Sequence, residues 1–278
     1  MIELLTLTNL PEFADRCDQL PGMRLFVDLE RNGKAERQQG RNTFISTHTV
    51  ADVGHVKAVL KHAKLMVRVN PIELTNQADC SAEVNAVLAQ GADLLMLPMF
   101  STPAEVSAFA ALVADRAPIV ALLETTGALA SLDDWISTPG LQEVFVGLND
   151  LHLSLGCQFM FEPLLLGHVD RVADAAKAHG LRFGFGGIAR LDEGMLAGRD
   201  VLAEHVRLGS SAVILSRTFT RAASDPAGGT FEQAVAELRG VERALHERTS
   251  QQTEADRTRT GDRIAELAAS LSLAKATA

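Results

Sequence analysis

Two acidic residues stand just after segments that have the character of buried strands. Glu124 follows the apolar segment 118–123, and Asp150 lies two residues past the apolar segment 143–148. Segments that are apolar along their whole length are typical of parallel sheets covered by helices on both faces. Because such folds place their chemistry just beyond the carboxyl ends of the strands, we expect Glu124 and Asp150 to lie in a functional site.

Two carboxylates without a cluster of thiolates or histidines favour a hard cation. Mg²⁺ typically takes one or two protein carboxylates and leaves positions for water and substrate oxygens. We therefore predict that Glu124 and Asp150 bind Mg²⁺ or Mn²⁺. The alternative is that each acid caps a local element, namely the helix beginning at Thr125 or the turn before Leu151. Their pairing on adjacent strands favours the metal site.

Further polar residues follow the second and third predicted strands. Asp28 and Glu30 alternate in sequence, as do Arg68 and Asn70, and alternate residues share one face of a strand. The planar guanidinium of Arg68 is suited to a carboxylate or enolate oxygen, so we predict that it binds substrate and takes part in catalysis. The alternative is a structural ion pair with Asp28 or Glu30. For Asp28 and Glu30, a structural or supporting role is favoured over direct catalysis. Glu30 is expected to lie at the substrate pocket.

Candidate proton-transfer groups are His48 and His152, because only histidine has an ordinary pKa near neutrality. A hydrogen-bonded structural role is the alternative for each. Gly186-Gly187 and Ser216-Arg217, at the last two strands, could form a phosphate site of the kind found in barrels. No comparable set of charged residues can be assigned to the opposite end of the strands.

The order of the predicted elements positions these residues on one rim. Eight strand segments alternate with helical segments, which predicts an α/β fold, a (β/α)8 TIM barrel. The expected strands are 2–7, 24–29, 65–69, 93–97, 119–123, 144–148, 182–185 and 212–215, and the expected helices are 11–20, 49–63, 82–90, one from 103, 127–136 and 163–179. The segment 32–41 is expected to be a loop or short helix, and 43–47 is too short to count as a barrel strand.

Two helical segments, 231–247 and 255–275, follow the barrel pattern. We therefore divide the chain into a barrel core over 1–222 and a C-terminal helical extension over 223–278. The extension is expected to pack on the barrel or on a neighbouring subunit.

Composition limits the possible partners. The chain has 278 residues and a net charge of −9, which argues against a nucleic-acid partner. No apolar run approaches the ~20 residues of a membrane span, and the amino terminus lacks the basic region of a secretory signal. Three widely spaced cysteines, with no CxxC, fit reduced thiols. We expect a cytoplasmic protein with no membrane partner. The absence of tyrosine excludes a catalytic Tyr.

Five motifs, in order, resemble the HpcH/HpaI aldolase and citrate lyase β-subunit family of the phosphoenolpyruvate/pyruvate barrel superfamily. They are VDLE (27–30), VRVNP (67–71), LLMLPMF (94–100), LLETTGALASLDDW (122–135) and VFVGLNDLHLSLG (144–156). The resemblance implies a metal-dependent barrel that cleaves or forms carbon–carbon bonds in 2-oxo acids or acyl-CoA esters. It also implies a homo-oligomer, in which C-terminal helices are often exchanged between subunits.

The resemblance assigns roles to individual residues. It implies that Glu124 and Asp150 are the Mg²⁺ or Mn²⁺ ligands and that Arg68 stabilises the enolate. Gly147 and Asn149 would lie in the loop that lines the pyruvate pocket. The expected activity is that of a class II aldolase, which cleaves 4-hydroxy-2-oxo acids into a pyruvate- or oxaloacetate-like 2-oxo acid and an aldehyde. The alternatives are an acyl-CoA ester lyase, with CoA contacts from Arg31, Arg41 and Arg217, or a degenerate binding subunit.

One departure from the family pattern affects the proton-transfer group. The pyruvate aldolase branch carries Asp-Gly-Glu-His after the second strand, whereas this chain has Asp28-Leu29-Glu30-Arg31. The histidine of that motif is therefore missing, and the Asp-Leu-Glu form is more similar to the citrate lyase branch, which usually continues with Asp. Either His48, a metal-bound water or the substrate itself supplies the base, or the aldol chemistry is altered.

Overall fold

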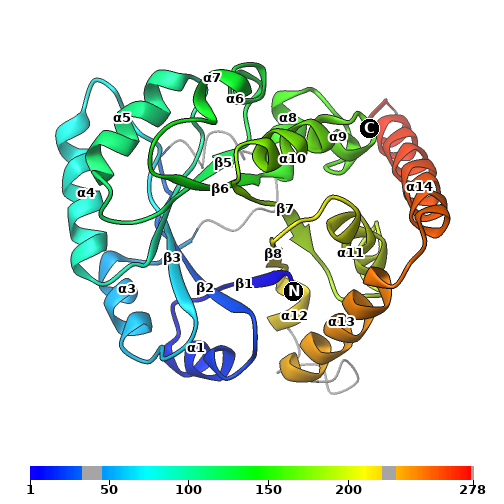
Figure 1. Ribbon diagram of the computed structural model, residues 1–278, viewed down its shortest axis with the longest axis horizontal. Coiled ribbons are helices and arrows are strands. Elements are labelled where there is room, and N and C mark those ends of the chain that lie inside the picture. Colours follow the sequence, from blue (N-terminus) through cyan, green and yellow to red (C-terminus); the bar gives the residue numbers. More distant parts are fainter. Residues whose placement is uncertain (33–45, 221–229, 277–278) are drawn as a thin grey trace.

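Eight parallel strands form a closed barrel in which each strand pairs with its neighbours in chain order and β8 pairs with β1 (Figure 1). The computed structural model describes residues 1–32, 46–220 and 230–276. The strands are β1 (Glu3–Leu7), β2 (Met23–Asp28), β3 (Lys64–Arg68), β4 (Leu94–Leu97), β5 (Ile119–Leu123), β6 (Leu141–Val146), β7 (Arg182–Ile188) and β8 (Ala212–Leu215). The predicted (β/α)8 barrel is confirmed.

Helices surround the barrel and cover the outer faces of the strands (Figure 1). They are α1 (Pro11–Asp18), α3 (Val50–Lys57), α4 (Gln77–Ala89), α5 (Pro103–Val113), α6 (Thr126–Ala130), α7 (Leu132–Trp135), α8 (Leu148–Ser154), α9 (Glu162–Leu165), α10 (His168–Ala178), α11 (Gly198–Arg207), α12 (Arg217–Thr220), α13 (Phe231–His246) and α14 (Ser250–Ala276). One apolar core lies between strands and helices, and a second fills the inside of the barrel.

The apolar core inside the barrel lies directly beneath the polar residues at the carboxyl ends of the strands. Side chains alternate along each strand, so every second residue points into the barrel. The inward residues in the middle of the strands are apolar and buried, namely Leu5, Phe26, Met66, Leu94, Met96, Val120, Leu122, Phe145 and Ala212. On β2, β3 and β5 the next inward residue toward the carboxyl end is Asp28, Arg68 or Glu124. The polar residues therefore stand on top of a packed apolar layer.

The amino-terminal end of the barrel carries its own ion network, so the expectation that this end lacks charged residues was wrong. The Arg24 guanidinium donates to both carboxylate oxygens of Glu143, at 3.0 and 2.9 Å, and also to Glu3. Arg182 binds Glu3 at 2.6 Å and Glu143 at 3.3 Å. All four residues lie at or near the start of a strand, on the inward face.

Several predicted boundaries differ from the observed ones. The sixth strand ends at Val146, and Leu148 already belongs to α8. The helix expected over 163–179 is interrupted, because Gly167 adopts a φ of +74° between α9 and α10. Helix α11 was not predicted. The predictions for 32–41 and 43–47 concern mainly residues outside the described part of the chain, as does the boundary at 222/223.

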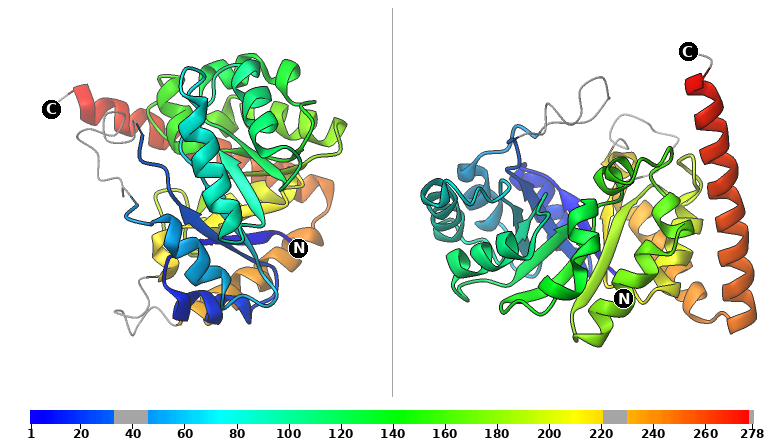
Figure 2. Two further views of the ribbon diagram at one scale, coloured as in Figure 1. Left: turned by 90° about the vertical axis from the view of Figure 1, so that its left-hand side faces the viewer. Right: turned by 90° about the horizontal axis from the view of Figure 1, so that it is seen from above.

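The C-terminal helices pack on the barrel of the same chain. Helix α13 holds the first strand, because Glu242 accepts from the Ile2 N–H at 2.7 Å and Arg239 donates to the Ile2 carbonyl at 2.6 Å. Helix α14 lies along the outside of the barrel against α9 and α11, with Ile264 buried (Figure 2). Whether α14 also contacts a neighbouring subunit stays a prediction. Among the described residues, no helix is both long and apolar enough to cross a membrane.

The ion network at the amino-terminal end generates a stability prediction. The side chains of Arg24 and Glu143 are both 1% exposed. We expect Arg24→Met to lower the free energy of unfolding by about 3–5 kcal/mol, because it leaves a buried carboxylate with fewer donors. Urea unfolding measures this loss, and Arg24→Met/Glu143→Gln should recover part of it. The control is Arg199→Met in an exposed pair with Asp192, expected to cost at most about 1 kcal/mol. Equal losses in Arg24→Met and the control would contradict the prediction.

Candidate active site

Arg68 is held by two carboxylates at the carboxyl end of the barrel. It is the register partner of Asp28, and its Nε and Nη2 donate to the two Asp28 carboxylate oxygens, each at 2.8 Å. Its Nη1 lies 3.3 Å from Glu30 Oε2, and its guanidinium lies 5.6 Å from the ring centroid of Phe26. The structural ion pair considered as an alternative is therefore present. It fixes the guanidinium, whose side chain is 16% exposed and can still be reached by a ligand.

Glu124 does not cap the helix that follows it. That role belongs to Thr125, whose hydroxyl accepts from the Ala128 N–H at 3.0 Å. The buried Glu124 carboxylate instead accepts from the Met99 N–H at 3.0 Å. Met99 adopts a left-handed φ of +56°, an unusual conformation for a residue with a side chain. The backbone after β4 thus orients the carboxylate, leaving Glu124 available as a ligand.

Asp150 lies in the first turn of α8, whose N-cap is Gly147. A Cβ added at Gly147 would come within 2.7 Å of Glu124 Oε2, so the absence of a side chain brings this loop against the Glu124 carboxylate. Gly186 plays a similar part on β7, where a Cβ would meet the Leu148 side chain at 2.8 Å. These close approaches bring the start of α8, and with it Asp150, up to the end of β5.

The charges around Glu124 change its acidity. The pKa of Glu124 is raised to about 8, chiefly by burial; the Arg68 guanidinium lowers it, and the negative charges of Glu30 and Asp150 raise it. Burial alone would lower the pKa of Arg68, but Asp28, Glu30 and Glu124 hold it above its ordinary value. In the described part of the chain, the carboxylates of Asp28, Glu30, Glu124 and Asp150 therefore lie near the Arg68 guanidinium. An added cation would relieve the repulsion between Glu124 and Asp150, so these carboxylate donors fit a hard divalent ion.

The acids do not form a complete ligand set by themselves. Among the described residues, no group of three or more His, Cys, Asp or Glu side chains is arranged to hold a metal. A cation on Glu124 and Asp150 would therefore need oxygens from water or substrate. Mg²⁺ commonly binds in this way, with one or two carboxylates.

The two candidate histidines differ in environment. His48 is buried, and its Nδ1 accepts from the backbone N–H of Asp28 at 3.2 Å. His152 lies two residues after Asp150 in α8, which places the two about 200° apart around the helix. Its Nδ1 faces the Leu148 carbonyl at 3.1 Å and must donate to it. The structure therefore brings His48 next to the group formed by Arg68, Asp28 and Glu30, which we call the Arg68 cluster. It turns His152 to a different side of α8 from Asp150.

The remaining predicted residues lie around the same rim. Asn149 is exposed beside Asp150. Asn70 accepts from the N–H of Arg31 and binds Glu83 through its amide, so it holds the β2 and β3 loops together. Gly186-Gly187 lie within β7 rather than after it, and Ser216 continues the pairing of β8 with β7. The suggested phosphate site there stays a prediction, and Arg41 lies outside the described residues.

Sequence reasoning missed two contributors. The role of Met99 depends on a backbone N–H, for which the sequence carries no signal. Arg31 stood out in the sequence because it departs from the family motif. The sequence could not show which group its guanidinium contacts. Its Nη2 donates to the His48 carbonyl at 2.8 Å.

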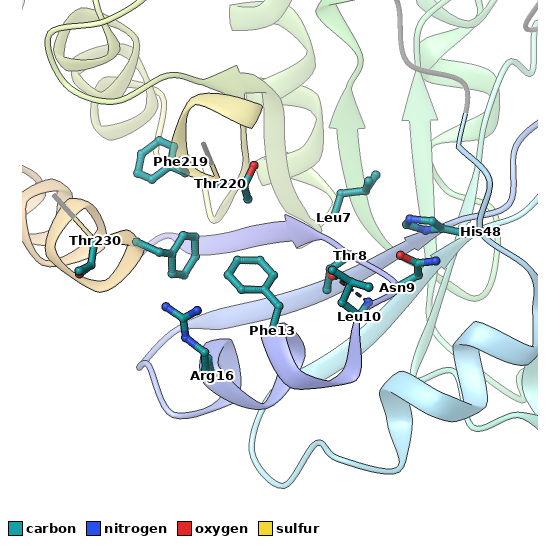
Figure 3. Close-up of a pocket in the computed structure, with 11 residues that line it drawn as sticks. Leu7, Thr8, Asn9, Leu10, Phe13, Arg16, His48, Phe219, Thr220 and Thr230 are labelled. Carbon is teal, nitrogen blue, oxygen red and sulfur yellow. Dashed lines mark hydrogen bonds between the residues drawn. The ribbon is translucent and has the colours of Figure 1, made fainter. Parts of the chain in front are cut away.

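A cavity of about 480 Å³ adjoins His48 beyond the ends of β1 and β8. Its lining is mainly apolar, and Figure 3 shows His48 and Asn9 at one end with Thr230 at the other. The lining residues are Leu7, Thr8, Asn9, Leu10, Phe13, Arg16, His48, Phe219, Thr220, Thr230 and Phe231. The cavity is suited to an uncharged, partly apolar portion of a ligand.

A closed parallel barrel with an arginine and several acids on its carboxyl-end rim defines a (β/α)8-barrel enzyme. The chain belongs to the HpcH/HpaI aldolase/citrate lyase family, whose model matches residues 16–195. The resemblance noted in the five motifs is thereby confirmed, and the family is one of lyase-type enzymes.

Curated relatives and solved structures agree with this membership. A (3S)-malyl-CoA thioesterase from Cereibacter sphaeroides is 30% identical over 174 residues, which cover 60% of this chain and 57% of the relative. The match therefore spans little more than half the length of that protein. A family member from Burkholderia cenocepacia has a TM-score of 0.62 at 18% identity, covering 86% of this chain and 94% of that one. The citrate synthase SbnG has a TM-score of 0.61 at 16% identity with the same coverage. These two structures show the fold alone.

The raised pKa of Glu124 predicts how stability depends on pH without metal. The folded protein keeps this proton up to about pH 8, whereas the unfolded chain releases it near 4.5. With Glu124 present, the free energy of unfolding therefore falls as the pH rises from about 4.5 to about 8, because the folded state disfavours the charged form. A Gln side chain, which does not titrate, has no such effect. In EDTA, urea unfolding should show Glu124→Gln gaining on the wild type between pH 5 and 8 and no further above that. A flat difference, like that expected for exposed Glu254→Gln, would contradict the prediction.

Proposed function

We propose that the protein is a metal-dependent carbon–carbon lyase that stabilises an enolate. The observation that carries the proposal is the fixed guanidinium of Arg68, held by Asp28 and Glu30 on the rim where Glu124 and Asp150 also lie. An enolate oxygen or a substrate carboxylate needs positive charge in a site that is oriented before the reaction. Without its carboxylate partners, the long side chain of Arg68 would have to be ordered at each binding event.

Glu124 and Asp150 are the residues that would hold Mg²⁺ or Mn²⁺. When bound, such an ion supplies Lewis-acid stabilisation of the negative charge on an enolate oxygen. The Met99 N–H keeps the Glu124 carboxylate oriented, and Gly147 leaves room for it. The apolar layer under Arg68, with Phe26 at its top, keeps water from entering from below.

The first substrate class is the 4-hydroxy-2-oxo acids. A base takes the proton of the 4-hydroxyl, the bond between C3 and C4 breaks, and its electron pair forms the enolate of pyruvate. The aldehyde leaves, and a proton added at C3 gives pyruvate. Arg68 would bind the carboxylate or the enolate oxygen through this sequence.

A second candidate is a lyase for acyl-CoA esters, such as malyl-CoA. The specific observation in its favour is the 30% identity to proteins named (3S)-malyl-CoA thioesterase, together with the Asp28-Leu29-Glu30 form of the strand-two motif. The largely apolar cavity beside His48 offers space for an extended uncharged portion of such an ester. The same rim residues would stabilise the enolate in both reactions.

A direct assay separates these functions. We expect purified protein with Mn²⁺ or Mg²⁺ to release pyruvate from 4-hydroxy-2-oxo acids or to consume malyl-CoA, and each substrate is tested separately. EDTA and Glu124→Ala should each reduce turnover by at least about 100-fold, because the charge on the enolate then lacks its main stabilisation. Unchanged turnover after either treatment would reject metal dependence. If neither substrate class reacts, yet Mn²⁺ and the enolate mimic oxalate bind, the substrate assignment is wrong.

The close approach at Gly147 provides a test of the metal ligands. We expect Gly147→Ala to weaken Mn²⁺ binding by about 10–100-fold, because the new methyl group displaces the Glu124 carboxylate. Isothermal titration calorimetry measures the affinity. The matched control is Gly240→Ala in α13, where an added Cβ meets nothing within 4 Å. Equal affinities in the two variants would show that Glu124 is not a ligand.

A further inference from the structure

Met99, whose N–H donates to Glu124 Oε1 at 3.0 Å, has a left-handed backbone with a φ of +56°. A residue with a side chain keeps such a conformation only where the surrounding structure imposes it. On the amino-terminal side, β4 ends at Leu97, which is the register partner of Ala121 on β5. Pro98 follows, and its ring restricts its own φ. The backbone is therefore fixed directly before Met99.

Phe100 fixes the backbone directly after Met99. Its side chain is buried, and its ring meets the Trp135 indole edge-on, with ring centroids 5.0 Å apart and an angle of 83° between the planes. Trp135 is itself held, because its Nε1–H donates to the Ala128 carbonyl at 2.8 Å. The Phe100 carbonyl accepts from the Thr125 hydroxyl at 2.8 Å. Both the side chain and the carbonyl of Phe100 are therefore bound, which restricts rotation of the peptide groups around Met99.

The Thr125 hydroxyl uses all of its hydrogen-bonding capacity in this contact region. A hydroxyl offers one donor and two acceptor positions. The donor binds the Phe100 carbonyl, and the acceptor positions receive the Ala128 N–H at 3.0 Å and the Ser101 hydroxyl at 3.2 Å. Thr125 is 8% exposed, so water cannot readily replace these contacts. An apolar side chain at this position would remove the donor to the Phe100 carbonyl.

Helix α6 and the loop after β4 approach each other closely at this point. A Cβ added at Gly127 would come within 2.6 Å of the Ser101 carbonyl oxygen. This approach brings the Thr125 hydroxyl within reach of the loop, although Thr125 directly follows Glu124 in the sequence. One short segment thus carries both the carboxylate and the hydroxyl that anchors the backbone donor of that carboxylate. The other carboxylate oxygen, Oε2, is the one next to Gly147 at the start of α8.

We propose that Thr125 is a positioning residue for the candidate metal ligand Glu124. By holding the Phe100 carbonyl, the Thr125 hydroxyl keeps Met99 in its left-handed conformation. The Met99 N–H then holds Oε1 of Glu124 and leaves Oε2 on the side of α8, where Asp150 also lies. The effect on a bound cation rests on the proposed function, whereas the effect on the Met99 N–H does not.

The Met99 N–H is observed directly in protein without metal or substrate. The chain has seven methionines, so ¹⁵N-methionine labelling gives few amide signals, and the Met99 signal is the one lost in Met99→Leu. We expect Thr125→Val to displace this signal and Thr125→Ser, which keeps a hydroxyl, to restore it. The signals of Met23 and Met66, both buried in the barrel, should stay in place and report an intact fold.

An unmoved Met99 signal in a folded variant that lacks the hydroxyl would overturn the proposal. Thr125→Ala is the second such variant. It removes the hydroxyl without placing a methyl group against the Phe100 carbonyl, and it replaces Thr125→Val if that variant does not fold. Both variants should displace the Met99 signal.

Mn²⁺ binding measures the consequence for the site. We expect Thr125→Val to weaken Mn²⁺ binding by about 10–100-fold in isothermal titration calorimetry, because the group that orients the Glu124 carboxylate is lost. Thr125→Ser should recover most of this affinity. The matched control is Thr249→Val, which also removes a hydroxyl that accepts from a backbone N–H, that of Gln252 at 3.3 Å, but lies at the start of α14 on the outside of the barrel. Equal affinities in Thr125→Val and Thr249→Val would contradict the positioning role.

The two experiments separate this proposal from the proposed function. If the wild type binds no Mn²⁺, the proposed metal site is wrong, and the Met99 signal in metal-free protein still decides the role of Thr125. If the wild type binds Mn²⁺ but the Met99 signal is the same in Thr125→Val, the metal site stands and the role of Thr125 is rejected.

Discussion

The structure of the rim depends on one guanidinium placed among carboxylates. The Arg68 guanidinium contacts Asp28 and Glu30, and Glu124 acts on it electrostatically. Asp150 adds a further negative charge near Glu124. Burial is the main cause of the raised pKa of Glu124; the Arg68 guanidinium opposes it, and the negative charges of Glu30 and Asp150 add to it. A divalent cation held by Glu124 and Asp150 would relieve the repulsion between these two carboxylates.

The opposite end of the barrel uses the same residue types with a different result. Arg24 and Arg182 meet Glu3 and Glu143, so the charges of this network balance. A balanced, largely buried network needs no ligand, and it stabilises a single arrangement of the strands. The amino-terminal end therefore contributes to stability, whereas at the carboxyl end the acids Glu124 and Asp150 repel one another and would be relieved by a bound cation. This division agrees with the general design of (β/α)8 barrels.

The sequence predicts what depends on local pattern. Runs of apolar residues located the strands, and acids just after β5 and β6 located Glu124 and Asp150 on one rim. What it could not predict depends on contacts between distant segments. The Met99 N–H that orients Glu124 comes from another strand end, and the left-handed backbone there has no glycine to announce it. The Arg24–Glu143 pair joins residues 119 positions apart. Helix α8 was missed because the apolar segment continues from β6 into it without a break.

The two histidines show why residue type alone could not assign the base. His152 donates from Nδ1 to the Leu148 carbonyl, so its neutral ring has the basic nitrogen at Nε2, yet it does not share a helix face with Asp150. His48 adjoins the Arg68 cluster, yet its accepting nitrogen is used by Asp28. His48 therefore lies on the same side of the site as Arg68, through its contact with Asp28, whereas His152 is turned to another side of α8 from Asp150. Residue type alone does not distinguish these two positions, because they depend on which backbone groups each ring meets. The group that transfers the proton in the proposed reaction stays a prediction.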